Sequence, residues 1–349
     1  MTNLYRSWVV DTESSGLRLD VFLQKMGAER SRSEWSRLIE EGCVFINLKK
    51  ITQRSHRLVV LDEVMFDQQQ IEPVAKTVTS NFNYVAPEIL FEDESLMVIN
   101  KPEGLPVHAG NGIPFEKTLA HWVLSKKYLS KDDEWPEEVV QDSRWGIVHR
   151  LDLCTSGAMV IAKNAKVHRD LSLAFQNRLI HRRYFAVTGG SPSNLSNKIP
   201  ALLDKWCHER KAAFKMTGNK FSLATQYGRD PTHPLRMSPI FEGGKRAITH
   251  AYIHSEATPH AIIELKLQTG RTHQIRSHLR FLGYSIVGDT LYGGQKWHRV
   301  LLHSHTIRFV HPVTGATIEA NAPSPSFLEA CLQLGLRVPS NTDDLWQET

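Results

Sequence analysis

One polar loop near the middle of the chain carries a carboxylate in a setting that suits catalysis. Residues 145–148 and 158–162 are apolar and are predicted as strands, and the segment between them is polar. Catalytic side chains often lie where a rigid strand meets an accessible loop, so Asp152 could act there as a nucleophile or a general base. An Asx turn, in which this side chain accepts hydrogen bonds from the backbone two or three residues further on, explains the same spacing. Taken alone, the residue and its spacing favour the Asx turn.

A second polar stretch, residues 269–279, holds two arginines, two histidines and a glutamine within eight residues, at the predicted start of a helix. On a helix, Arg276 shares a face with Thr272 and Leu279, so its side chain starts beside apolar neighbours. An arginine in such a place commonly pairs with a carboxylate or a phosphate. A basic helix on the protein surface is the alternative, and the residues alone support both interpretations equally.

The chain lacks the patterns that mark metalloproteins, nucleotide-cofactor enzymes and membrane proteins. Its 349 residues include four cysteines but no C-x-x-C pair, no H-E-x-x-H and neither glycine-rich phosphate-binding pattern. We therefore expect no metal and no cofactor. No apolar run is long enough to cross a bilayer, and the first residues do not resemble a secretory signal. We expect a cytoplasmic, monomeric protein that does not contact membranes.

The amino-terminal part is predicted to form a small basic module. Apolar spacing over residues 19–26 and 35–39 indicates two short helices, and residues 44–46 and 59–61 are predicted as strands. Between residues 25 and 57, eight basic residues stand against four acidic ones, which is a candidate footprint for a nucleic acid. Most charge clusters are solvated protein surface, and charge alone leaves that alternative open. The side chains expected to bind RNA here are Arg32, Arg37, Lys49 and Lys50.

The rest of the chain is predicted to be a mixed α+β body. A helix is expected at 276–281, and the stretch from Ser191 to Lys245 is expected to be irregular. Strands outnumber helices, which favours a largely antiparallel central sheet. The strands are expected at 96–99, 145–148, 158–162, 184–187, 261–267, 301–305 and 306–310. The predicted domains are residues 16–76, a linker over 77–87 and the body over 88–330.

The amino-terminal module resembles the alpha-L, or S4-like, RNA-binding domain. In that family the second helix and the following turn present basic side chains to folded RNA, so the resemblance implies binding and no chemistry. The residues that carry it are Arg18-Leu19-Asp20-Val21-Phe22-Leu23, Ser31-Arg32-Ser33, residues 38–42 and Val44-Phe45-Ile46-Asn47.

Residues 93–323 resemble the RluA family of pseudouridine synthases. The resemblance implies the pseudouridine synthase fold and an isomerase that converts uridine in structured RNA to pseudouridine without metal or cofactor. It rests on five motifs in the family's order: Lys101-Pro102-Glu103-Gly104, His149-Arg150-Leu151-Asp152 with Thr155-Ser156-Gly157, Arg183-Tyr184-Phe185-Ala186-Val187, residues 270–276 with 283–293, and residues 302–323.

The second resemblance also implies roles for single residues. Asp152 would be the catalytic carboxylate, paired with Arg276, and Tyr184 would stack on the uracil and assist the proton at C5. Arg150 would fill the gap left by the flipped nucleotide or contact phosphate, because the target base must leave its stack to reach a pocket. His149 and Arg271 complete the predicted RNA-binding set. Whether Asp152 attacks covalently or acts as a base stays open.

Substrate and activity both have alternatives. Family members with an added alpha-L domain typically modify large-subunit ribosomal RNA, which is the expected partner, and transfer RNA is the alternative substrate. A catalytically silent RNA-binding assembly factor would keep the fold without the chemistry. A nucleoside hydrolase would need a second positioned carboxylate and would release free uracil. Leu153 and Cys154 stand where the family usually has a charged pair, so we expect the polarity beside Asp152 to differ from the family's.

Overall fold

The computed structural model describes residues 5–27, 32–40, 42–67, 85–109, 113–126, 145–196, 201–209 and 211–338, together with residues 129, 135 and 139. The chain forms two compact units. One comprises residues 1–83 with 108–146, and the other comprises residues 84–107 with 147–349. Most of the linker predicted over residues 77–87 lies outside the described residues. No described helix has both the length and the apolar character needed to cross a bilayer.

In the first unit, two helices and a small antiparallel sheet share one apolar core. The strand order among the described residues is β1-β4-β2-β3. Phe22, Trp35 and Phe66 are almost completely buried in that core. The elements are β1 (Tyr5–Val9), α1 (Leu19–Met26), α2 (Arg32–Glu40), β2 (Val44–Ile46), β3 (Lys49–Lys50), β4 (Glu63–Asp67), η2 (Phe115–Lys117) and α3 (Leu119–Ser125). The two expected helices and the strand expected at residues 44–46 are confirmed.

The strand expected at residues 59–61 is wrong. These residues form an exposed turn in which Leu61 has a positive φ of 71°. The turn is held by Asp62, whose carboxylate accepts a hydrogen bond from the backbone N–H of Val59. The strand begins only after this turn, at β4. The prediction failed because residues 59–61 are apolar, as in a buried strand, but face solvent.

The second unit is built on one long, mixed but mostly antiparallel sheet. Its described strands run in the order β11-β10-β12-β13-β8-β14-β7-β6-β5, with β15 paired to β14 and β9 paired to β10. Only the β14–β7 pairing is parallel among these strands. The strands are β5 (Glu88–Glu92), β6 (Leu96–Lys101), β7 (Ser156–Ala162), β8 (His181–Gly189), β9 (Ala212–Thr217), β10 (Lys220–Arg229), β11 (Met237–Pro239), β12 (Lys245–Ala257), β13 (His260–Leu267), β14 (Leu302–Val310) and β15 (Thr317–Asn321). The predicted α+β class is confirmed.

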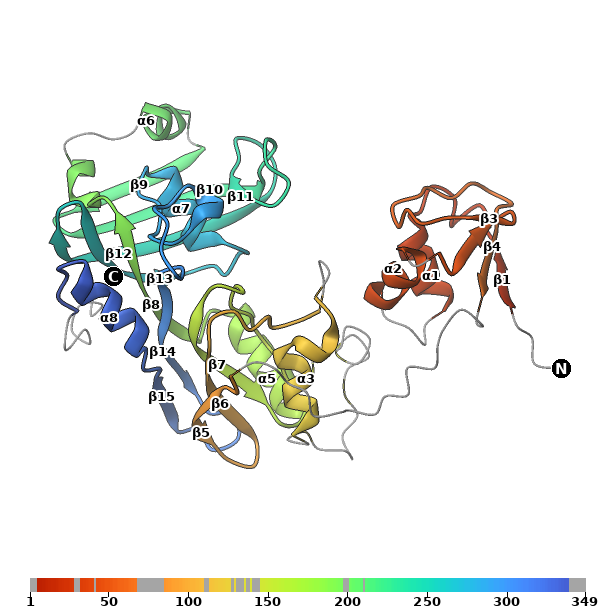
Figure 1. Cartoon of the computed structure of the whole chain (residues 1–349), viewed down its shortest axis with the longest axis horizontal. Coiled ribbons are helices and arrows are strands. Elements are labelled where there is room, and N and C mark those ends of the chain that lie inside the picture. Colours follow the sequence, from red (N-terminus) through yellow and green to blue (C-terminus); the bar gives the residue numbers. More distant parts are fainter. Residues whose placement is uncertain are drawn as a thin grey trace. The chain divides into compact units, whose positions relative to one another are not determined.

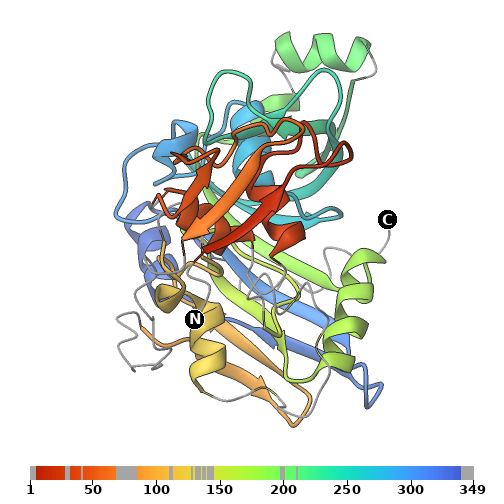
Figure 2. The same cartoon turned by 90° about the vertical axis from the view of Figure 1, so that its right-hand side faces the viewer.

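Helices cover parts of this sheet. α5 packs on β7, α7 packs on β11 and β12, and α6 lies at the β9 end of the sheet in both views (Figures 1 and 2). The helix expected at 276–281 is confirmed as α7. The helices are α5 (Ala165–Gln176), α6 (Ala201–His208), α7 (Gln274–Phe281), α8 (Pro325–Gln333), η3 (Pro192–Ser196) and η4 (Thr290–Tyr292).

Two expectations about this unit are wrong. The stretch from Ser191 to Lys245 contains the helix α6 and the strands β9, β10 and β11. The hairpin of β9 and β10 turns at Gly218, whose φ of +56° few other residues adopt readily. Residues 145–148 do not form a strand, because only Ile147 makes a single bridge, to Ile161 of β7. The chain there is a loop that leads directly into the polar segment.

Gly157 of β7 is required where this strand meets β14. Its φ is +121°, and a Cβ atom would lie 2.1 Å from the backbone oxygen of Ser304. We expect Gly157→Ala to lower the free energy of unfolding by about 3 kcal/mol, because backbone strain adds to a backbone clash. Urea unfolding measures this. The matched control is Gly104→Ala, where φ is +77° but no atom lies within 4 Å of the new Cβ, so strain acts alone. Equal losses in the two variants would contradict the role of close strand approach.

Candidate active site

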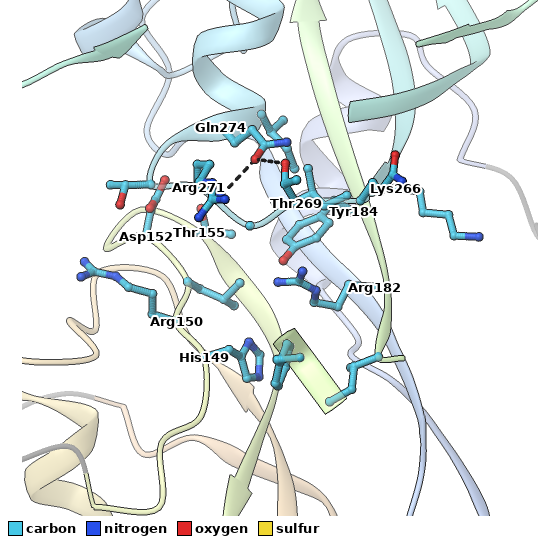
Figure 3. Close-up of a pocket in the computed structure, with 18 of the residues that line it drawn as sticks. His149, Arg150, Asp152, Thr155, Arg182, Tyr184, Lys266, Thr269, Arg271 and Gln274 are labelled. Atoms are coloured by element: carbon cyan, nitrogen blue, oxygen red, sulfur yellow. Dashed lines mark hydrogen bonds between the residues drawn. The ribbon is translucent and has the colours of Figure 1, made fainter. Parts of the chain in front are cut away.

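A cavity of about 980 Å³ lies within the second unit (Figure 3). Its wall is formed by the loop before β7, the turn from α5 into β8, and the segment that joins β13 to α7. Asp152 supplies the only carboxylate among the lining residues. Six of the lining residues have cationic side chains: Arg150, Arg178, Arg182, Lys266, Arg271 and Arg276. The cavity therefore favours an anionic ligand and places a single acidic group inside it.

Asp152 lies on the loop that precedes β7, with its side chain mostly buried. Its Oδ2 atom is 3.5 Å from Nη1 of Arg276. The N–H of Thr155 donates to the backbone oxygen of Asp152 at 3.0 Å, so the loop is closed through the main chain. This geometry leaves the carboxylate facing a guanidinium and the cavity, and does not support the Asx turn that the spacing alone favoured.

Arg276 is held chiefly by Asp289, for which no role was predicted. Its Nε and Nη2 atoms donate to the two carboxylate oxygens of Asp289 at 2.7 and 2.8 Å, and both side chains are buried. Burial alone would lower the pKa of Arg276, but the hydrogen bonds with Asp289 and the nearby acidic groups outweigh it and raise that pKa. Arg276 is therefore a permanent cation in a fixed pose, with its third nitrogen directed at Asp152.

Asp289 lies in a tight turn that brings its carboxylate to Arg276 of α7. Asp289 caps η4, and the N–H of Tyr292 lies 3.3 Å from its Oδ1 atom. Gly288 has a φ of +85°, and a Cβ there would lie 1.7 Å from the backbone oxygen of Arg299. The signal for this site was present in the Gly288-Asp289 motif, but the motif alone does not reveal which side chain it faces.

Tyr292 supports the arginine from the other side. The guanidinium of Arg276 lies 5.0 Å from the centre of the Tyr292 ring. The Tyr292 hydroxyl is 3.1 Å from Nδ1 of His273 and accepts the N–H of Met237 at 2.9 Å. Burial raises the pKa of Tyr292 to about 12, so its hydroxyl stays neutral at physiological pH. Sequence reasoning also missed this residue.

The segment that carries Arg271 is fixed by Gln274, the first residue of α7. The side-chain oxygen of Gln274 accepts hydrogen bonds from the hydroxyl of Thr269 and the N–H of Arg271 (Figure 3). Its amide nitrogen donates to the backbone oxygen of Ile248 on β12. The loop is thus tied to the sheet, while the Arg271 side chain stays exposed at the cavity.

The structure brings six of the predicted site residues to one cavity. Tyr184 of β8 is buried with its ring at the cavity wall, while Arg150 is exposed at the cavity's edge (Figure 3). The other four are Asp152, Arg276, Arg271 and His149.

The remaining predicted residues belong to the first unit. Lys49 and Lys50 are exposed on β3. Arg32 of α2 is half-exposed and donates to the buried carboxylate of Asp20 at 2.9 Å. Arg37 is on α2, but its side chain lies outside the described residues.

A hydrogen-bonded network surrounds Ser156, which follows the loop that carries Asp152. Ser156, the first residue of β7, receives a hydrogen bond from Nη2 of the buried Arg299 at 2.7 Å and faces Nδ1 of His303 at 2.8 Å. His303 Nε2 is 2.9 Å from the backbone oxygen of Ala322. A neutral His303 with its proton on Nε2 satisfies all of these contacts, because the Ser156 hydroxyl then donates to Nδ1.

This network makes stability depend on pH. Burial lowers the pKa of His303 to about 4, below its unfolded value of about 6.5. Below about pH 6.5, His303 becomes protonated in the unfolded chain but stays neutral in the folded chain. The free energy of unfolding therefore falls as the pH drops from about 6.5 towards 4. The slope contributed by this residue is up to about 1.4 kcal/mol per pH unit.

Urea unfolding between pH 7 and pH 4.5 measures the slope. We expect His303→Gln to flatten it relative to the unmodified protein. His208→Gln, at an exposed side chain on α6, is the matched control and should leave the slope unchanged. An identical slope in His303→Gln and the unmodified protein would contradict this assignment.

Comparison with known proteins agrees with this geometry. Residues 95–281 match the family model of RNA pseudouridylate synthases, and residues 17–64 match the S4 domain. The chain belongs to the RNA pseudouridylate synthase family. The expected resemblances to pseudouridine synthases of the RluA type and to the S4-like domain are confirmed, and with them the assignment as an isomerase that acts on RNA.

The similarity extends over nearly the full length. The chain is 32% identical over 97% of its length, and 85% of the relative's, to the ribosomal large subunit pseudouridine synthase D of Neisseria meningitidis serogroup A. It is 31% identical to the protein of the same name from Xylella fastidiosa, over 93% of this chain and 90% of that one. An RNA pseudouridine synthase of Synechocystis sp. is 32% identical, with 93% and 91% covered.

Proposed function

We propose that this pseudouridine synthase modifies uridine in large-subunit ribosomal RNA, with Asp152 as its catalytic carboxylate. The observation that carries the catalytic part is the single carboxylate of the cavity, placed 3.5 Å from a guanidinium that Asp289 holds in position. The names of the similar Neisseria and Xylella proteins support ribosomal RNA as the substrate.

The proposed chemistry needs only groups that line this cavity. The N1–C1′ bond of uridine breaks, and its electron pair leaves on the uracil. Asp152 either forms a bond to C1′, which breaks again when C5 attacks C1′, or removes a ribose proton and returns it when the new bond forms. The uracil turns, C5 forms the new bond to C1′, the C5 proton is released to water and N1 takes up a proton. Arg276 orients the Asp152 carboxylate, and the Tyr184 ring packs against the uracil.

The RNA would be held by basic residues of both units. At the cavity we propose Arg150, Arg271 and His149, and in the S4 domain Arg32, Arg37, Lys49 and Lys50. The domain boundaries 16–76 and 88–330, the monomeric state and the cytoplasmic location remain predictions that accompany this proposal.

The contribution of the S4 domain to RNA binding can be measured through the salt dependence of the affinity for RNA. We expect the double change Lys49→Gln and Lys50→Gln to weaken RNA binding and to reduce the slope of log K against log salt by about one to two. Filter binding over a salt series measures this. The matched control is Lys166→Gln, at an exposed side chain on α5 that pairs with Asp170. An unchanged slope in the double variant would remove these lysines from the RNA-binding surface.

The substrate assignment is tested with unmodified transcripts. Purified protein is incubated separately with large-subunit ribosomal RNA and with a pool of transfer RNAs, and pseudouridines are mapped by chemical labelling. We expect conversion at defined uridines of the ribosomal RNA alone. Conversion only in transfer RNA would favour the alternative substrate, and conversion in neither would favour a silent assembly factor.

A further inference from the structure

A second group of side chains lies in the same cavity, around Phe175 at the end of α5. The His149 ring packs against Phe175 at 4.6 Å between ring centres, with 31° between the planes. The guanidinium of Arg182 lies 5.3 Å from the centre of the same ring. Arg178 and Ile180 also line this part of the wall. The catalytic scheme above gives no role to Phe175, Arg178 or Arg182.

His149 presents a buried donor that has no acceptor. Its Nε2 atom accepts the N–H of Val160 at 3.0 Å, so the neutral ring must carry its proton on Nδ1. Burial and the charge of Arg182 hold the pKa of His149 well below its usual range, which keeps the ring neutral. The Nδ1 atom is buried and makes no hydrogen bond within the described part of the chain. Such an orphaned donor is costly unless a ligand supplies the acceptor.

Arg182 presents a second donor of the same kind. Side chains alternate along β8, so Arg182 and Tyr184 share the face that lines the cavity, as Figure 3 shows. Arg183 points to the other face and pairs with Glu319. The Nε atom of Arg182 is buried without a hydrogen-bond partner among the described residues.

The chemistry of this group indicates the ligand. Both unsatisfied atoms are N–H donors, Arg178 and Arg182 are cations, and Asp152 is the only carboxylate that lines the cavity. A ligand must therefore bring negatively charged acceptor oxygens. The Phe175 ring is already in contact with His149 and Arg182, which argues against a stacked base as the occupant.

We propose that His149 Nδ1, Arg182 and Arg178 form a subsite for a backbone phosphate of the RNA strand, at a nucleotide next to the target uridine. This inference rests on the proposed function for the identity of the RNA. The subsite fixes the register of the strand, so that the neighbouring uridine reaches Asp152 and Tyr184.

A binding cycle tests the proposal. The probe is a synthetic hairpin of large-subunit ribosomal RNA, with its backbone phosphates replaced one at a time by neutral methylphosphonates. Binding is measured by fluorescence anisotropy to full-length Asp152→Asn protein, which we expect to bind RNA without turnover, with and without Arg182→Gln. We expect Arg182→Gln to weaken binding of the unmodified hairpin about tenfold. At one phosphate position, the methylphosphonate should weaken binding to the Asp152→Asn protein by the same factor. At that position it should not weaken binding to the double variant any further.

Two comparisons keep the result interpretable. Arg169→Gln, an exposed arginine on the same helix as Phe175 but outside the cavity, should leave binding unchanged. Arg178→Gln, at an exposed side chain, repeats the cycle if Arg182→Gln does not fold, and should lose about threefold at the same phosphate. Independent losses at every phosphate, or no loss in either arginine variant, would overturn the subsite. Conversion of the same hairpin by the unmodified protein reports separately on the proposed function.

Discussion

Asp152→Asn is expected to abolish pseudouridine formation, with kcat lowered by at least about 10⁴-fold, the size seen when a central nucleophile or base is removed. The change keeps the shape of the side chain but removes the negative charge that would trap C1′ or take a ribose proton. Asp152 is also the only carboxylate lining the cavity, so no other lining side chain can take its place. Single-turnover conversion of ribosomal RNA measures the loss.

RNA binding should survive this change. Asp152 faces a cavity with six cationic side chains, so removing its charge makes the cavity more attractive to phosphate. We expect the Kd of the variant to be equal to, or slightly lower than, that of the unmodified protein. Asp152→Ala should behave in the same way. Residual conversion within about tenfold of the unmodified rate would show that another group carries the chemistry.

Asp289→Asn is expected to lower kcat by about 100-fold, the effect of misplacing a catalytic group by about an ångström. Without the second carboxylate, Arg276 keeps its charge but loses its bidentate anchor. It can then turn fully towards Asp152 and occupy the acceptor lone pairs that the reaction needs. Because Asp289 does not line the cavity, the Kd for RNA should change little, so the effect should appear in kcat.

The same variant should lose stability. Breaking one side of a buried ion pair costs roughly 3–5 kcal/mol, because a charge is left without its partner. The matched control is Asp93→Asn, which breaks the 2.8 Å contact between Asp93 and His311 in the same unit but away from the cavity. That control should lose stability and keep kcat. An equal fall of kcat in both variants would mean that Asp289 acts through stability alone.

Local patterns and the family resemblance predicted different parts of the site. Local patterns placed Arg276 on a helix and Tyr184 on a strand, whereas only the resemblance made Asp152 the catalytic carboxylate, because its spacing alone favoured an Asx turn. All three line the cavity. The placements of Arg276 and Tyr184 succeeded because apolar periodicity is a property of consecutive residues. Their catalytic roles remain predictions.

The pairing of Arg276 could not be read completely from the sequence. Arg276 was expected to pair with Asp152, but its two short hydrogen bonds go to Asp289, and Asp152 is the longer contact. The position of Asp289 depends on a tight turn at Gly288 and on the close approach of Gly288 to the backbone of Arg299, which are contacts outside any regular element. Periodicity contains no information about such contacts.

Strand prediction failed where a paired strand is rich in polar residues and where an exposed turn is apolar. β9 and β10 contain lysines, threonines and glutamine, so the pattern suggested irregular chain, although pairing with β12 makes β10 a central strand. The opposite error occurred at residues 59–61, where exposed apolar side chains imitated a strand. Tertiary pairing determined both outcomes.

We propose above all that the residues lining the cavity around Asp152 transfer the bond of C1′ from N1 to C5 of the uracil in RNA. The most direct measurement uses large-subunit ribosomal RNA labelled with tritium at C5 of uridine. We expect the unmodified protein to release one tritium into water for every pseudouridine formed, with no free uracil, and the Asp152→Asn protein to release none. Release of free uracil, or tritium release that persists without the Asp152 carboxylate, would contradict it.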